Sequence, residues 1–156
     1  MNELEEAELQ DNVAEMERLM VQLGWVLHRQ QTQRLKSHNL TMPQFMLLRA
    51  LQRLGDSCTM SELAEAAMQV SATVTGIMDR LEERELVGRR PNPADRRSYQ
   101  VVLTPQGESL LADVDQDNRE RIAAYLRTMP ANGRAQLLQL LGGYLAALTQ
   151  GDGAHV

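Results

Sequence analysis

The sequence LVGRRPNPADRRSYQVVLT, residues 86–104, decides which fold this chain adopts. Two short runs that tend to be apolar, 86–90 and 99–103, flank the segment 91–95, which contains two prolines and an asparagine. Such residues favour turns, so the simplest interpretation is a two-stranded β-hairpin. Residues 86–100 also hold four arginines and one aspartate, a local net charge of +3. We therefore expect a basic hairpin.

The residues before this hairpin predict two helices with a short turn between them. Thr59 and Glu62 have the T-x-x-E spacing of a capping box, so a short helix begins there and ends near Met68. Ser71 can cap the next helix, whose apolar residues recur at helical spacing: Val74, Ile77, Met78 and Leu81. Two helices joined by about three residues are typical of a helix-turn-helix. With the hairpin directly after them, they indicate a winged helix-turn-helix.

Helical patterns extend on both sides of this region. Apolar residues at three- and four-residue steps predict a long N-terminal helix that ends around residues 37–39. Thr41 and Gln44 form a second capping box for the helix that follows. The pair Thr104-Pro105 begins a later helix, residues 130–133 break it, and a last helix comes after the break. The predicted fold class is therefore mostly α with a small β-hairpin wing.

The overall composition bounds the class of protein. The chain has 156 residues and a formal net charge of −5, with seven acids and one base in its first twenty residues. This negative net charge differs from the basic character of most nucleic-acid binders. An aromatic content of 3% argues against binding of single-stranded nucleic acid through stacked aromatic rings. The single cysteine and the acidic N-terminus predict a soluble cytoplasmic protein without an internal disulfide. The longest charge-free run, 135–151, is too polar and too short to predict a membrane span.

The helix over residues 71–83 has an exposed face that could read DNA. Projected at 100° per residue, Ala72, Gly76, Asp79 and Glu83 lie opposite the apolar stripe, with Thr73 and Arg80 beside them. Small residues there allow the backbone to approach base edges in the major groove, and a threonine methyl can contact a thymine methyl. The alternative is an ordinary solvated face, which the two carboxylates favour because they repel phosphates. The basic hairpin that follows favours the DNA-reading interpretation.

These motifs closely resemble those of the multiple-antibiotic-resistance regulator (MarR) family of bacterial transcription factors. The resemblance rests on SELAE at 61–65, TVT at 73–75, DRLEER at 79–84, LV at 86–87 and, most specifically, DRRSYQVVLT at 95–104. It extends through the helix layout from about residue 10 to 150, and it implies double-stranded DNA as the partner. It further implies that Arg97 is the wing-tip arginine that enters the minor groove, with Asp95 as its orienting partner.

The resemblance also implies which residues meet DNA. Two departures from the family pattern are Gly76, where many members have a long polar side chain, and Met68, where a glycine is common at the turn. They leave the operator sequence unpredictable. The predicted DNA-binding residues are Ser71, Thr73, Thr75, Gly76, Arg80, Arg89, Arg90, Asp95, Arg96 and Arg97.

A homodimer is expected on two grounds. The resemblance implies that the first helix and the last two helices pack against their mates. Independently, the last helix carries an apolar stripe that a compact winged helix cannot cover by itself, and such a patch usually marks an interface. The predicted dimerisation residues are Leu9, Val13, Met16, Leu137, Leu141, Tyr144, Leu145 and Leu148. The expected domains are an N-terminal dimerisation helix at 1–36, the winged helix-turn-helix at 37–104, C-terminal dimerisation helices at 105–150 and a tail at 151–156. A two-fold dimer predicts a roughly palindromic operator.

A small ligand is the expected signal. Family members commonly bind a small aromatic or phenolic effector between the dimerisation helices and the DNA-binding lobe. Trp25, His28, Met46 and Arg49 lie on the helices where such a cleft would be; the alternative is that Trp25 and Met46 are core and the other two are surface. We therefore expect a sequence-specific transcriptional regulator, a dimeric repressor that its ligand releases from the operator.

Other mechanisms have weaker support in the sequence. A redox-responsive regulator would use Cys58, but in the peroxide-sensing branch of the family the reactive cysteine lies in the first helix, so a bystander thiol is favoured. The three histidines are scattered, which predicts no metal site, and neither a cofactor motif nor a catalytic triad is evident. A helical interaction protein with weakened DNA binding stays as an alternative, because Gly76, Asp79 and Glu83 weaken the reading face.

Overall fold

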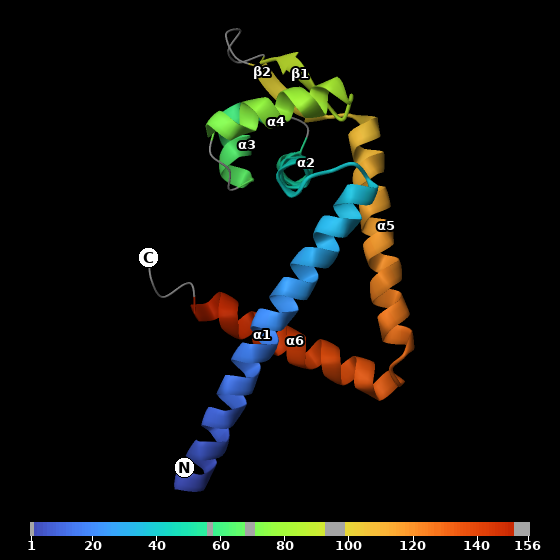
Figure 1. The fold of residues 1–156 in the computed structure, drawn as a ribbon. Coiled ribbons are helices and arrows are strands. Elements are labelled where there is room, and N and C mark those ends of the chain that lie inside the picture. Colours follow the sequence, from blue (N-terminus) through green and yellow to red (C-terminus); the bar gives the residue numbers. More distant parts are fainter. Residues whose placement is uncertain (1, 56–57, 68–70, 93–98, 152–156) are drawn as a thin grey trace. The chain divides into compact units, whose positions relative to one another are not determined.

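Six helices and one hairpin follow one another along residues 2–55, 58–67, 71–92 and 99–151, the part of the chain that the computed structural model describes (Figure 1). The helices are α1 (Glu3–Ser37), α2 (Met42–Leu54), α3 (Met60–Ala66), α4 (Ser71–Glu83), α5 (Pro105–Arg127) and α6 (Ala131–Gly151). The strands β1 (Val87–Pro91) and β2 (Tyr99–Leu103) lie between α4 and α5. The predicted fold class, mostly α with a β-hairpin wing, is confirmed.

Capping boxes begin three of the helices. Thr41 caps α2 with Gln44, and Thr59 caps α3 with Glu62, as the sequence predicts. A third box, made by Asn2 and Glu5, begins α1. The far end of α1 is also where the sequence places it, because α1 ends at Ser37 and the next residues turn away from helical geometry.

Three helix boundaries differ from the expectation. Helix α3 ends at Ala66, two residues early, and α4 begins at Ser71 itself rather than after it. The prediction that residues 131–133 belong to the break before α6 is wrong, since they form its first turn, with the Arg134 amide donating to the Pro130 carbonyl at 3.1 Å. An N-terminal first turn tolerates Asn and Gly because its amides have no helical partner to lose.

Strand β2 is the central strand of the wing. On one side it pairs antiparallel with β1, in the register Val87↔Leu103 and Arg89↔Val101. On the other side Val101 pairs with Cys58, whose carbonyl accepts from the Val101 amide at 2.9 Å. The residue just before α3 therefore joins the hairpin to the helix-turn-helix, which fixes the strand that carries the wing.

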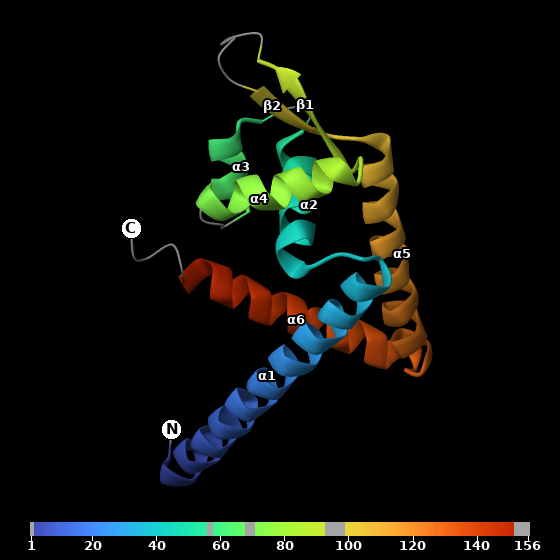
Figure 2. The ribbon, with the colours of Figure 1, turned by 45° about the horizontal axis from the view of Figure 1, so that its top comes forward.

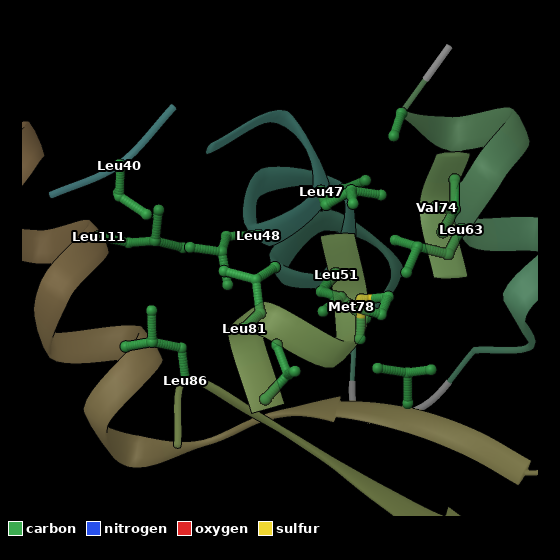
Figure 3. Packing of buried hydrophobic residues seen from close by; sticks show 14 of the residues in the cluster. Leu40, Leu47, Leu48, Leu51, Leu63, Val74, Met78, Leu81, Leu86 and Leu111 are labelled. Carbon is green, nitrogen blue, oxygen red and sulfur yellow. The ribbon is translucent and has the colours of Figure 1, made fainter. Parts of the chain in front are cut away.

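The chain divides into two compact units, residues 1–114 and 115–156. The core of the first unit lies between α2, α3, α4 and the hairpin, and Figure 3 shows its leucines converging there. Leu35 of α1 and Leu111 and Val114 of α5 belong to the same buried cluster. The core therefore takes in the helices that flank the helix-turn-helix. The second unit contains the rest of α5 and α6, which are separate helices joined through Pro130.

Candidate nucleic-acid interface

Helix α4 buries one face and presents the other to solvent. Val74, Met78 and Leu81 are completely buried, and they lie against α2 and α3. The opposite face carries the exposed Thr73, Thr75, Gly76 and Arg80. The exposed face that the sequence projects for this helix is therefore confirmed at Gly76 and Arg80, and Thr73 and Thr75 lie at its two edges.

Helix α3 supports the start of this surface. The Thr59 amide and hydroxyl donate to the Glu62 carboxylate at 2.7 and 2.9 Å, and these hydrogen bonds lower the pKa of Glu62. At the other end of α3, the Arg53 guanidinium of α2 donates to the Ala66 carbonyl at 2.9 Å. Both ends of α3 are thus held, so the short helix keeps a fixed position under α4.

The two predicted arginines of β1 lie on opposite faces of the hairpin, because side chains alternate along a strand. Arg89 points to α4, where its guanidinium forms an ion pair with Asp79 and a second one with Glu82 at 3.4 Å. Arg90 lies on the other face and lines a pocket of about 450 Å³ with Gln52 and Glu108. Only Arg90 of this pair is without an ion-pair partner among the described residues.

The base of the wing is locked to the start of α5. The Thr104 hydroxyl donates to the Glu85 carbonyl at 2.6 Å and accepts from the Gly107 amide at 3.1 Å. Glu85 has a φ of 57°, so the chain reverses sharply between α4 and β1. Figure 2 shows the result, with the base of the hairpin at the end of α4 and the start of α5. The wing and the exposed face of α4 are therefore held by one set of contacts.

The tip of the wing lies outside the described residues. Asp95, Arg96 and Arg97 belong to the segment 93–98, and the side chain of Ser71 is likewise outside the description. Their predicted roles in DNA binding stay predictions.

Comparison with known proteins identifies the family of this chain. Residues 40–99 match the model of the MarR family. The HTH-type transcriptional regulator YsmB of Bacillus subtilis is 33% identical over 119 residues, which cover 76% of this chain and 78% of YsmB. The chain belongs to the MarR family. It is a winged helix-turn-helix transcriptional regulator that binds DNA.

Three more comparisons agree with this assignment. The HTH-type transcriptional repressor NicR of Pseudomonas putida is 38% identical over 102 residues, 65% of this chain and 64% of NicR. The crystal structure of the YusO protein from Bacillus subtilis superposes with a TM-score of 0.77 at 25% identity, covering 88% of this chain and 97% of YusO. A MarR family protein from Bacillus stearothermophilus also superposes with a TM-score of 0.77, at 24% identity, over 90% of this chain and 97% of that chain, so the MarR fold extends through the helices outside residues 40–99.

A pocket of about 390 Å³ opens between the MarR helix-turn-helix and its wing. Its lining includes Thr75 and Arg89, which the sequence predicted to bind DNA, and Thr59, Ser61 and Tyr99, for which the sequence predicted no binding role. Tyr99 is 61% exposed and pairs with Pro91 across the hairpin. An aromatic residue at the solvent-facing end of a strand was the signal that could have found it.

Cys58 lacks the environment of a redox sensor. The side chain is 3% exposed, and burial, with a further contribution from the Glu62 carboxylate, raises the pKa of the Cys58 thiol to about 11. Reactive cysteines are accessible and have a lowered pKa, since the thiolate is the nucleophile. The position of Cys58 therefore supports the interpretation as a structural thiol.

The residues expected to hold an effector are not gathered into either of the two pockets described above. Trp25 is 72% exposed and His28 is exposed as well, so the alternative that Trp25 belongs to the core of this chain is wrong. Met46 is half-buried, and the Arg49 guanidinium lies 5.1 Å from the centre of the Phe45 ring.

The described residues contain no group of three His, Cys, Asp or Glu side chains that could hold a metal ion. None of their helices combines the length and the apolar character needed to cross a membrane.

Proposed function

We propose that this MarR-family chain is a dimeric, sequence-specific repressor of a roughly palindromic operator, released by a small aromatic ligand. The observation that carries the proposal is the exposed face of α4 with its small residues, lying beside a basic hairpin in one rigid arrangement. A helix of this kind enters the major groove, and the arginines of the hairpin tip reach phosphates or the minor groove. The name of NicR, a transcriptional repressor, supports repression as the outcome.

Titration of operator DNA at several salt concentrations tests the binding mode. The DNA is the region upstream of the gene that encodes the chain. We expect a steep fall in affinity with salt, because phosphate contacts release counterions. Arg97→Ala should weaken binding about tenfold and reduce the slope of log K against log salt by about 0.9 for one lost phosphate contact. Arg119→Ala, which removes an exposed arginine of α5, is the matched control.

Base reading by α4 is tested by a second variant. Thr73→Ala should change the preference among operator sequences more than the salt slope, because a base contact carries sequence information and a phosphate contact does not. An equal loss of affinity on every sequence would contradict base reading by Thr73.

Dimerisation is supported by apolar side chains on both units. Leu9, Val13 and Met16 of α1 are more than four-tenths exposed in the single chain. In the second unit, the exposed members of the predicted stripe on α6 are Leu141, Leu145 and Leu148, while Leu137 and Tyr144 are half-buried. Apolar side chains in such number mark an interface, because a monomer exposes them at a cost in free energy.

The oligomeric state is measured by light scattering after size-exclusion chromatography. Wild-type protein should have the mass of a dimer, and Leu145→Glu should shift it to the monomer. Gln139→Glu is the control, since it adds the same charge on the opposite face of α6. A wild-type monomer, or equal shifts in both variants, would contradict dimerisation through this stripe.

The ligand has two candidate locations. The pocket between α3, α4 and the wing combines a methionine, an aromatic ring and hydroxyls, which suits a small aromatic or phenolic ligand. A ligand there would occupy space beside Thr75 and hinder the approach of α4 to DNA. The other location is at the residues predicted from the sequence, Trp25, His28, Met46 and Arg49. In a thermal-shift screen of small aromatic acids, loss of the shift in Thr75→Val supports the first location, and loss in Trp25→Ala supports the second.

A further inference from the structure

Arg89 connects the wing to the recognition helix. Its guanidinium pairs with Asp79 through Nη2 and lies 3.4 Å from Glu82 through Nε. The two carboxylates are three residues apart in α4, so they lie on one side of the helix, the side that faces β1. One arginine therefore bridges two carboxylates on another element.

Arginine suits this geometry better than lysine does. The planar guanidinium presents several donors in fixed directions, so it can pair with two carboxylates at once. Here Nη2 donates to Asp79 and Nε lies near Glu82, and the side chain is about one-third exposed. Arg90, the next residue along, extends from the opposite face of the hairpin and faces neither carboxylate.

The pairing also changes the electrostatics of the reading surface. Asp79 and Glu82 lie on the helix that would approach DNA, where unpaired carboxylates repel phosphates. With Arg89 between them, one of the two negative charges is offset, and the distance between β1 and α4 is fixed. DNA binding by this fold needs α4 and the wing to engage the duplex together.

We propose that Arg89 is a positioning residue for DNA binding, which acts through Asp79 and Glu82 and makes no DNA contact of its own. It sets the wing against α4, and the contacts of the wing with DNA are left to the other arginines. This inference rests on the proposed binding of DNA by α4 and the wing together.

A charge swap tests the inference in operator titrations. Arg89→Glu should weaken binding at least tenfold, since it places a third carboxylate beside the other two. Adding Asp79→Arg restores an ion pair with the two charges exchanged, and the double variant has the same net charge as wild type. Its affinity should therefore return to within about threefold of wild type. The matched control is Arg90→Glu with the same Asp79→Arg, which should not recover, because position 90 faces away from α4.

Two results of this titration would overturn the inference. If the swap at position 89 fails to recover binding, Arg89 contacts DNA itself. If Arg90→Glu with Asp79→Arg recovers operator affinity equally, the overall charge of the protein determines the affinity and the pairing of position 89 with position 79 does not. Arg89→Gln serves as the milder variant if the glutamate variant does not fold.

Hydrogen exchange of the hairpin amides tests the inference in the absence of DNA. Arg89→Gln should speed this exchange about two- to fivefold, as should Asp79→Asn with Glu82→Gln, and the triple variant should show no further increase. Unchanged exchange in Arg89→Gln overturns the positioning role even if DNA binds. Failure of the wild-type chain to bind DNA, with these exchange results intact, would instead contradict the proposed function.

Discussion

Gly107 lies in the first turn of α5, where the backbone of the preceding segment passes close to it. A Cβ at this position would overlap the Leu86 carbonyl oxygen and lie 2.8 Å from the Leu103 Cδ1. The oxygen belongs to the backbone and is already engaged, because it accepts from the Thr104 amide at 3.2 Å. Gly107→Ala therefore forces the start of α5 away from the base of the wing.

The expected loss can be bounded from these contacts. Overpacking of a well-packed site costs about 1–3 kcal/mol. The shift also weakens the Thr104 to Leu86 hydrogen bond and the bond from the Gly107 amide to the Thr104 hydroxyl, each worth about 1 kcal/mol. Alanine recovers up to about 1 kcal/mol through its higher helix propensity. We expect a net loss of about 2–4 kcal/mol in the free energy of unfolding.

Urea unfolding followed by far-UV circular dichroism measures this change. Gly76→Ala is the matched control, because Gly76 is also helical and, apart from its own helix backbone, no atom of the described residues lies within 4 Å of the place that a Cβ would take. The control should be neutral or stabilising by up to about 1 kcal/mol. If Gly107→Ala stays within about 0.5 kcal/mol of wild type, the close approach of Leu86 does not constrain the wing, and the reasoning is wrong.

Three further predictions concern the first unit. Because the pKa of the Cys58 thiol is about 11 in the folded chain and 9.0 ordinarily, the unfolded chain loses this proton first. Wild type should therefore lose stability relative to Cys58→Ala as pH rises from 9 to 11, by about 2 kcal/mol in urea titrations, and a constant difference would contradict this. Thr59→Ala removes the capping box of α3 and should cost about 1 kcal/mol, measured against Ser61→Ala as the control. Leu81→Ala should cost about 2–5 kcal/mol by the same measurement, since Leu81 is fully buried, and a cost below about 1 kcal/mol would mean that the core closes over the gap.

Local patterns explain why much of the fold could be predicted from the sequence. The capping boxes at Thr41 and Thr59 depend on residues three apart, and the hairpin depends on the turn residues between its strands. The same rules failed at Asn132 and Gly133, where residues typical of a break occupy the first turn of α6. Propensity alone does not separate a loop from a helix start, because both tolerate free amides.

The site was harder to predict because its contacts join distant residues. The exposed face of α4 followed from helical spacing, whereas the pairing of Arg89 with Asp79 depends on how the hairpin returns over α4. A sequence shows that Arg89 and Arg90 are adjacent and basic. It does not show that one lies over the helix and the other on the opposite face, since that depends on the register and orientation of the hairpin.

The pairing of Arg89 changes how the charge of the chain relates to DNA. The formal net charge is −5, yet residues 86–100 carry +3, so everything else carries a net charge of −8. Within the basic segment, Arg89 pairs with the carboxylates of α4, so we expect the other arginines of the segment to attract phosphates. An acidic protein whose net charge is positive only in this basic segment is repelled from DNA in most orientations. Weak non-specific binding and docking through one face follow from that distribution, and both favour a regulator that must find a single operator among many other sites.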